Sequence, residues 1–159
     1  MTKIIIVDEN DKIIGYKERG TLNFRDIYRV SALQVKNSVG QILLAQRKLT
    51  KKKNPGKWGP AVAGTNDEGE TYESNIIKEA EEEIGLVDFE MKVKNKQRVD
   101  EGFSNYFGVR FETVVDKNLS EFKIQEEELE KIKWFDRDEL LELIKKNPEN
   151  FIPNILDFI

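Results

Sequence analysis

Hydrophobic residues recur along the chain with two different periods, and these periods predict where strands and helices lie. Runs of β-branched residues, and runs that alternate apolar with polar residues, indicate strands at residues 4–7, 29–35, 41–46, 91–98, 106–115 and 131–135. Helical spacing predicts a helix over 71–84, a second one from Asp136 to about Lys146 and a short one after Pro148. Because strands and helices interleave without strict βαβ repetition, we expect an α/β (α+β) fold with helices packed on a mixed sheet.

Turn-forming residues separate these elements. A polar turn at 8–12 divides two short apolar runs, which predicts an N-terminal hairpin at about 3–16. We expect connections at the Pro- and Gly-rich residues 48–60, at 64–69, at the polar residues 99–105 and at the acidic residues 118–130, with a short apolar piece at 61–63. Gly85 follows the first helix, where a left-handed cap is favoured. With no internal repeat or linker, we expect one domain over 1–159 that ends in helices at about 136–158.

Two absences in the composition change what chemistry is available. The chain has 159 residues, a formal net charge of −4, and neither cysteine nor histidine. These absences exclude a disulfide framework, a thiolate nucleophile, a Ser-His-Asp triad and a zinc site built from Cys or His. Metal or acid–base chemistry must then rely on carboxylates, Lys, Tyr or backbone groups, and hard cations such as Mg²⁺ become the plausible metals.

The same composition bears on location and partners. The apolar run at residues 4–7 is too short for a signal peptide, and no run approaches the roughly 18 apolar residues of a membrane helix. We therefore expect a cytoplasmic protein without a membrane partner. The net negative charge argues against a stable nucleic-acid complex, because neutralising phosphates requires a basic surface.

The first predicted helix carries the most informative pattern. At about 100° per residue, one arc is apolar and a neighbouring arc is acidic; the first holds Ile76, Ile77, Ala80 and Ile84, and the second Glu79, Glu82 and Glu83. Like charges one turn apart repel each other, and Lys78 relieves the repulsion only in part. A solvated acidic face is the ordinary interpretation of such a helix, whereas a divalent cation beside the three carboxylates would explain why they cluster.

The residues around this helix resemble a known motif, the Nudix box. That motif spaces a glycine, several glutamates and a second glycine over 23 residues, and the chain matches it from 64 to 86 at Gly64, Glu70, Glu79, Ala80, Glu82, Glu83, Gly85 and Leu86. The one departure is Lys78, where the family has an arginine that orients the box glutamates. Lysine keeps the charge but loses the planar, bidentate geometry, so we expect weaker positioning rather than lost metal binding.

The resemblance implies a fold, an activity and a site. The fold is a Nudix-type α/β/α sandwich with a mixed sheet, and the activity is Mg²⁺- or Mn²⁺-dependent hydrolysis of a diphosphate linkage in a nucleoside diphosphate derivative or related compound. Glu79, Glu82 and Glu83 become the catalytic, metal-binding residues, with help from the Gly64 backbone carbonyl. Residues placed near the substrate are Arg47, Lys78, Glu70 (which also supports the loop) and Glu127.

The general base is left open by the sequence. One box glutamate is a candidate, and so is an acid from the run Glu126, Glu127 and Glu128, which precedes the last strand where several family members place such a residue. A solvated acidic loop is the alternative for that run. Arg47, at the end of a strand, and one or more of Lys51–Lys53 could reach diphosphate oxygens. A solvated basic loop is the alternative for the lysines, and the sequence leaves both interpretations open for Arg47.

Residues outside the box resemble the subgroup related to isopentenyl-diphosphate isomerases. The similarity includes Gln46-Arg47-Lys48, residues 54–58 and the Asn150–Pro153 ending. Those isomerases use a cysteine just before the box glycine and a histidine after it, and here the two positions hold Ala63 and Thr65. We therefore expect a hydrolase and rank the isomerase reaction last.

Other functions and contacts are left open at this stage. A Nudix-fold nucleotide-binding module without catalysis is the alternative function, supported only by Lys78. Trp58, Tyr72 and Phe103 are candidates for stacking on a base, although packing is the ordinary role of isolated aromatics, and Trp134 is expected in the core. The expected partner is a small diphosphate compound, with a nucleotide as the first candidate. A homodimer is also open, since dimers are common in the family.

Overall fold

A long central strand organises the sheet. The computed structural model describes residues 2–102 and 104–159. Its strands are β1 (Lys3–Val7), β2 (Ile13–Glu18), β3 (Ile27–Lys36), β4 (Ile42–Arg47), β5 (Trp58–Pro60), β6 (Val62–Thr65), β7 (Lys92–Glu101), β8 (Ser104–Val114) and β9 (Leu129–Phe135). The α-helices are α1 (Tyr72–Ile84) and α2 (Arg137–Lys146), with 3₁₀ turns at Leu119–Glu121, Pro148–Asn150 and Ile155–Phe158.

The described strands form one mixed sheet. β3 pairs with β1, β4 and β6 in antiparallel fashion and with β8 in parallel, over a register that runs from Tyr28 opposite Tyr106 to Lys36 opposite Val114. β2 lies outside β1, β7 outside β8, and both β5 and β9 pair with β4. The mixed sheet expected from the interleaved pattern is confirmed.

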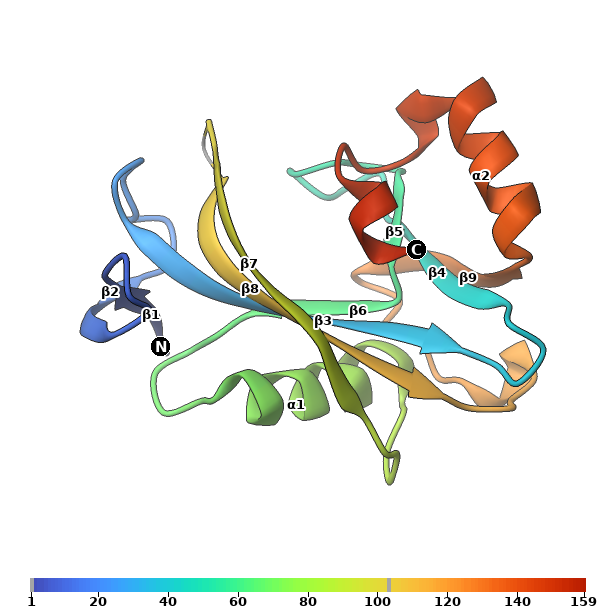
Figure 1. Cartoon of the computed structure of the whole chain (residues 1–159), viewed down its shortest axis with the longest axis horizontal. Helices are drawn as coiled ribbons and strands as arrows, with labels where there is room; N and C mark the ends of the chain where they lie inside the picture. Colours follow the sequence, from blue (N-terminus) through green and yellow to red (C-terminus); the bar gives the residue numbers. More distant parts are fainter. Residues whose placement is uncertain (1, 103) are drawn as a thin grey trace.

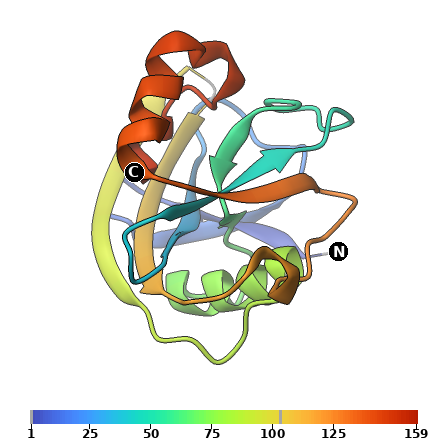
Figure 2. The ribbon, with the colours of Figure 1, turned by 90° about the vertical axis from the view of Figure 1, so that its right-hand side faces the viewer.

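The two helices cover opposite faces of this sheet. In β4, Leu43 and Ala45 belong to the hydrophobic cluster that packs α1, whereas Ile42 and Leu44 belong to the cluster that packs α2 and the C-terminal residues. Because successive side chains of a strand point to opposite faces, the sheet is sandwiched between the helices. Figures 1 and 2 show α1 below the sheet and α2 above it, so the α/β/α sandwich is confirmed.

Four segments depart from the elements expected from the sequence. β5 lies in the stretch predicted as loop, and β6 runs on through Gly64 and Thr65 rather than ending at residue 63. β7 continues to Glu101 and β8 begins at Ser104, so most of the predicted connection 99–105 is strand. Its residues are mostly polar, so the alternation of apolar and polar positions that marks a strand is absent there. The helix expected after Pro148 is two 3₁₀ turns rather than one helix.

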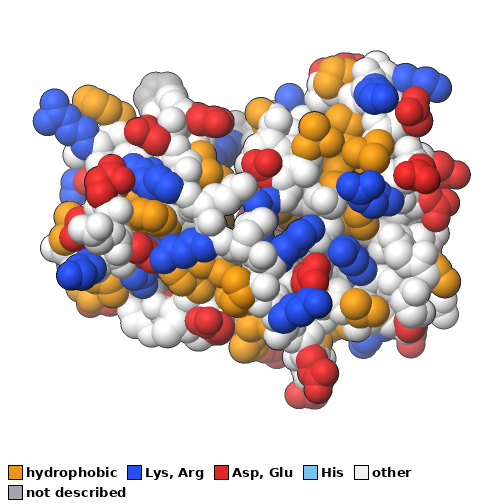
Figure 3. Space-filling view, in the orientation of Figure 1, with side chains coloured by type: hydrophobic (Ala, Val, Ile, Leu, Met, Phe, Trp, Pro, Cys, Tyr) orange, Lys and Arg blue, Asp and Glu red, His pale blue; other side chains and the backbone are white. Residues whose placement is uncertain are grey.

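The surface carries charges of both signs. In the view of Figure 3, acidic and basic side chains are interspersed over the face formed by β7 and its neighbours. Within the described residues, no helix combines the length and the apolar character needed to cross a bilayer.

Candidate active site

Helix α1 is fixed at both ends by its own sequence. Thr71 is the N-cap: its side chain accepts a hydrogen bond from the backbone of Ser74, whose hydroxyl in turn accepts one from the backbone of Thr71. At the other end Gly85 adopts the left-handed conformation with φ 67° and closes the helix. The buried stripe of Ile76, Ala80 and Ile84 sets the rotation of the helix, and this rotation turns Glu79 and Glu83 toward β6.

Gly64 and Glu79 are in direct contact. A Cβ atom built on Gly64 would lie 2.6 Å from Glu79 Cγ and 2.7 Å from its Cδ, closer than real Cβ contacts allow. The glycine of β6 therefore leaves room for a carboxylate of α1 against the backbone. This contact is the structural reason for a glycine at the first position of the motif.

Glu83 lies beside Glu79 on the same side of the helix. Its carboxylate accepts a hydrogen bond of 3.3 Å from the backbone N–H of Ala63, on β6. Burial, reinforced by the negative charge of Glu79, raises the pKa of Glu83 well above its ordinary value. Burial also raises the pKa of Glu79, because the charge of Lys78 only partly offsets burial and the charge of Glu82. The negative charges of Glu79 and Glu83 are therefore only partly balanced by the cations around them.

Glu82 faces a different part of the surface. It is exposed and lines a groove that also contains Glu126 and Glu127, whereas Glu79 and Glu83 face β6. Within the described residues, no three carboxylates meet as a ready-made metal cage. The donor set at Gly64 nevertheless fits a hard cation, since carboxylate oxygens lie against the backbone. A positive ion there would offset the negative charge of Glu79 and Glu83, whose pKa values are raised mainly by burial.

Lys78 and Glu70 form a network ahead of the helix. The Nζ atom of Lys78 lies 3.0 Å from Glu70 and 3.6 Å from both Glu79 and Asp67. Burial acts to lower the pKa of Lys78, but the hydrogen bond to Glu70 and these acidic charges outweigh it and raise the pKa. Glu70 also accepts hydrogen bonds from the Asp67 backbone and from the Asn75 side chain. Both residues therefore brace the loop, and neither lines the main cavity described next.

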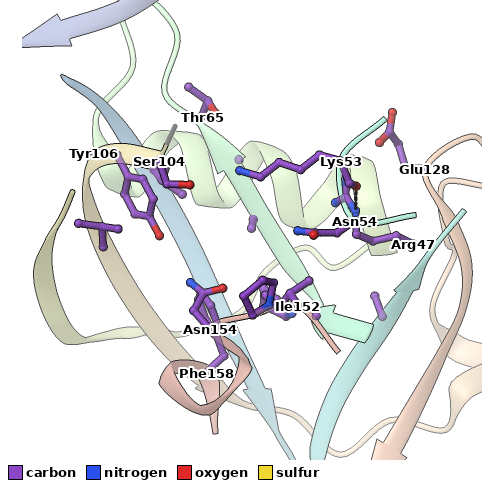
Figure 4. A pocket seen from close by; sticks show the side chains of 18 of the residues that line it. Arg47, Lys53, Asn54, Thr65, Ser104, Tyr106, Glu128, Ile152, Asn154 and Phe158 are labelled. Carbon is purple, nitrogen blue, oxygen red and sulfur yellow. Dashed lines mark hydrogen bonds between the residues drawn. The ribbon is translucent and has the colours of Figure 1, made fainter. Parts of the chain in front are cut away.

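A cavity of about 390 Å³ opens beside these carboxylates, within the range of roughly 300–1,000 Å³ usual for small-ligand sites. Glu83 and Gly64 line it on one side, and Arg47 and Lys53 contribute cationic groups. The Nε atom of Arg47 donates a hydrogen bond to the backbone carbonyl of Lys53, 2.9 Å away, which ties the loop after β4 to the strand end. Figure 4 shows these two side chains on the same side of the cavity as Glu128.

The acidic segment before β9 is divided between two surfaces. Glu128 lines the main cavity and pairs with Lys51, and its charge is among those that act on Glu83. Glu127, the residue selected from the sequence, lies in the groove with Glu82 instead. Three consecutive glutamates give no periodic signal that could distinguish them, so only the path of the chain separates their positions.

The far end of the cavity is aromatic. Tyr28 and Tyr106 lie side by side, with ring centroids 5.6 Å apart. The C-terminal residues Asn154 and Phe158 line the same cavity, and Figure 4 shows them on the side toward which the Tyr106 ring points. Burial raises the pKa of each tyrosine hydroxyl. Sequence reasoning missed all four residues, because the cavity joins distant segments and no local motif marks them.

The aromatic residues proposed from the sequence lie elsewhere. Trp58 packs edge-on against Phe135, with centroids 5.2 Å apart. Tyr72 donates a hydrogen bond from its hydroxyl to Asp11. Trp134, expected in the core, packs partly buried against the cluster between α1 and the sheet. Phe103 lies outside the described residues.

Sequence comparison identifies a family and its relatives. The model of the NUDIX domain matches residues 27–155. An uncharacterized Nudix hydrolase of Pseudomonas aeruginosa is 29% identical over 143 residues, covering 89% of this chain and 83% of the relative. An isopentenyl-diphosphate Delta-isomerase of Salmonella heidelberg is 35% identical over 86 residues, covering 52% of this chain and 47% of the isomerase.

Comparison of structures supports the same fold. DR0079 of Deinococcus radiodurans superposes with a TM-score of 0.79 at 22% identity, covering 91% of this chain and 89% of its own. The NUDIX domain of Shewanella oneidensis NrtR, determined in complex with ADP ribose, superposes with a TM-score of 0.60 at 16% identity, covering 73% and 77%. At these identities both similarities concern the fold alone, and the shared fold agrees with the α/β/α sandwich described above.

Proposed function

Because the chain belongs to the Nudix family, we propose that it is a Mg²⁺- or Mn²⁺-dependent hydrolase that cleaves a diphosphate linkage, with a nucleoside diphosphate derivative as the first candidate substrate. The observation that carries this proposal is the position of Glu79 and Glu83. Glu79 packs against Gly64, and Glu83 accepts a hydrogen bond from Ala63 beside it. Glu83 and Gly64 line a cavity that Arg47 and Lys53 also line. Carboxylates for a cation and cations for phosphate oxygens therefore face one space.

The proposed metal site uses the box residues. Glu79 and Glu83 would hold the cation together with the Gly64 carbonyl. Glu82, the third box glutamate on α1, would join them as a ligand from the neighbouring groove. When bound, such an ion neutralises the charge that develops on a diphosphate during hydrolysis. Arg47 and Lys53, which line the same cavity as Glu83, bind and orient the phosphate oxygens.

For the general base we propose Glu128 rather than Glu127. Glu128 shares the cavity with Glu83 and Arg47, whereas Glu127 faces the separate groove. In this role its carboxylate takes a proton from the water that attacks phosphorus, and the phosphorus–oxygen bond to the leaving phosphate breaks. Lys51 holds the carboxylate in place before substrate arrives.

The substrate assignment draws on the two ends of the cavity. Cationic groups line one end, and Tyr28 and Tyr106 line the other, which suits a diphosphate joined to a nucleoside. The NrtR domain, which shares the fold, was determined with ADP ribose. Ala63 and Thr65 line the same cavity without a thiol or an imidazole, so the isomerase reaction is not proposed.

The test is a panel of nucleoside di- and triphosphates, dinucleotides, nucleotide sugars and prenyl diphosphates, assayed with Mg²⁺ and with Mn²⁺. We expect metal-dependent release of a nucleoside monophosphate from at least one compound, and a fall in kcat on the order of 100-fold or more for Glu83→Gln. Glu73→Gln is the matched control, because Glu73 is exposed on the same helix and lines neither the main cavity nor the groove that holds Glu82. We expect that variant to keep wild-type activity.

Other outcomes would assign a different role. Tight nucleotide binding without turnover across the panel would indicate a binding module. Full activity in Glu83→Gln would overturn the proposed site.

A further inference from the structure

The N-terminal hairpin contacts the loop that leads into α1. This hairpin, β1 and β2, precedes residues 27–155, where the family model matches. The backbone N–H of Ile5 donates to Asn66, at 3.2 Å, and that of Glu68 donates to Lys3, at 2.7 Å. The loop that carries Asp67 and Glu70 is therefore attached to a part of the chain outside the matched domain.

Arg19, just after β2, extends this contact to the charged network. Its guanidinium lies 3.1 Å from Asp67 Oδ1, while the other oxygen of the same carboxylate lies 3.6 Å from the Nζ atom of Lys78. The Asp67 side chain is only 11% exposed, so its charge is poorly solvated and depends on these two cations. Asp67 thus bridges Arg19 and Lys78.

Charge balance shows why a second cation matters here. Lys78 faces three carboxylates at once, those of Asp67, Glu70 and Glu79. Its ammonium group is a single point charge, whereas an arginine can bond two carboxylates with its planar fork. Because Arg19 neutralises Asp67, Lys78 is left to hold Glu70 and Glu79.

We propose that Arg19 is a positioning residue for the cation site, acting through Asp67 and Lys78 on Glu79. The hairpin thereby supplies the guanidinium that the box itself lacks at position 78. This assignment rests on the proposed metal-dependent function. Arg19 itself touches neither the cavity nor its carboxylates.

The test measures Mn²⁺ affinity by electron paramagnetic resonance of the free ion, together with kcat on the best substrate of the panel. For Arg19→Met we expect the Mn²⁺ dissociation constant to rise on the order of fivefold. The thermal midpoint should fall only slightly, because the Arg19 side chain is 56% exposed and the poorly solvated Asp67 keeps Lys78 as a partner. Arg19→Lys should restore most of the affinity. Arg25→Met is the matched control, since Arg25 is an exposed arginine of the following loop that packs on Phe24.

A second background separates positioning from general charge loss. With Lys78→Arg already present, the guanidinium at 78 can bond two carboxylates, so adding Arg19→Met should weaken Mn²⁺ binding by less than about twofold. If Glu83→Gln weakens Mn²⁺ binding, the metal site stands. In that case wild-type affinity in Arg19→Met, or an equal loss of affinity in Arg25→Met, would overturn only the proposed role of Arg19. If Glu83→Gln also binds Mn²⁺ as the wild type does, the proposed metal site itself is wrong.

Discussion

At the scale of single residues, the candidate site depends on side chains that fit only because a neighbour leaves room. The contact between Gly64 and Glu79 is the sharpest case, since a methyl group on the glycine would overlap the carboxylate arm. The glycine of the motif is therefore needed for β6 and α1 to pack together, and the glutamates of the motif are the proposed metal ligands.

This contact predicts the effect of Gly64→Ala. Because the new Cβ would lie 2.6 Å from Glu79 Cγ, Glu79 must swing away, and we expect Mn²⁺ affinity to fall on the order of tenfold. Isothermal titration with Mn²⁺ measures this change. Gly15→Ala is the control, because a Cβ there meets nothing within 4 Å and should leave the affinity unchanged. Unchanged affinity in Gly64→Ala would show that Glu79 is not a ligand.

At the scale of elements, α1 was predicted well because all of its signals are local. Its apolar stripe and its closing Gly85 lie within ten residues, counted from 76 to 85, and the observed helix spans Tyr72–Ile84, with Thr71 as its N-cap rather than its first residue. β5 was missed because only its pairing with β4 makes it a strand. Glu128 and Tyr106 were not predicted as cavity residues for the same reason. They line the cavity because segments distant in the sequence meet there, and no local pattern marks such residues.

The N-cap gives a prediction for this helix. Thr71→Ala removes the hydrogen bond to the Ser74 backbone, and we expect the free energy of unfolding to fall by about 1 kcal/mol. Urea denaturation followed by circular dichroism measures the loss. Thr71→Ser keeps the hydroxyl and should retain most of the stability. A loss of equal size in both variants would mean that the cap bond does not stabilise the helix.

At the scale of the whole molecule, Asp11 joins elements that are far apart in the sequence. It sits in the turn between β1 and β2 and accepts hydrogen bonds from Arg29 on β3, Tyr72 on α1 and Lys96 on β7. Its side chain is 8% exposed. The N-terminal hairpin is thereby fastened to the sheet and to the start of the helix that carries the candidate site.

This junction predicts how stability depends on pH. Burial acts to raise the pKa of Asp11, but the hydrogen bonds from Lys96, Arg29 and Tyr72 outweigh it, so the folded-state pKa lies below the ordinary value of 3.8. The ionised form is then favoured by folding, and its contribution is fully present above the unfolded pKa and is lost as pH falls through the folded pKa. Asp11→Asn removes that contribution while tolerating the local φ of 59°.

We therefore expect Asp11→Asn to lower the free energy of unfolding by about 1 to 3 kcal/mol between pH 5 and 7, and the difference from wild type to shrink as pH falls below about 4. Urea denaturation at a series of pH values measures both. Asp88→Asn is the matched control, since Asp88 also has a positive φ, of 52°, but is exposed. A difference for Asp11→Asn that stays constant down to pH 3 would mean that its charge does not stabilise the junction. The loss would then come from the shape of the turn.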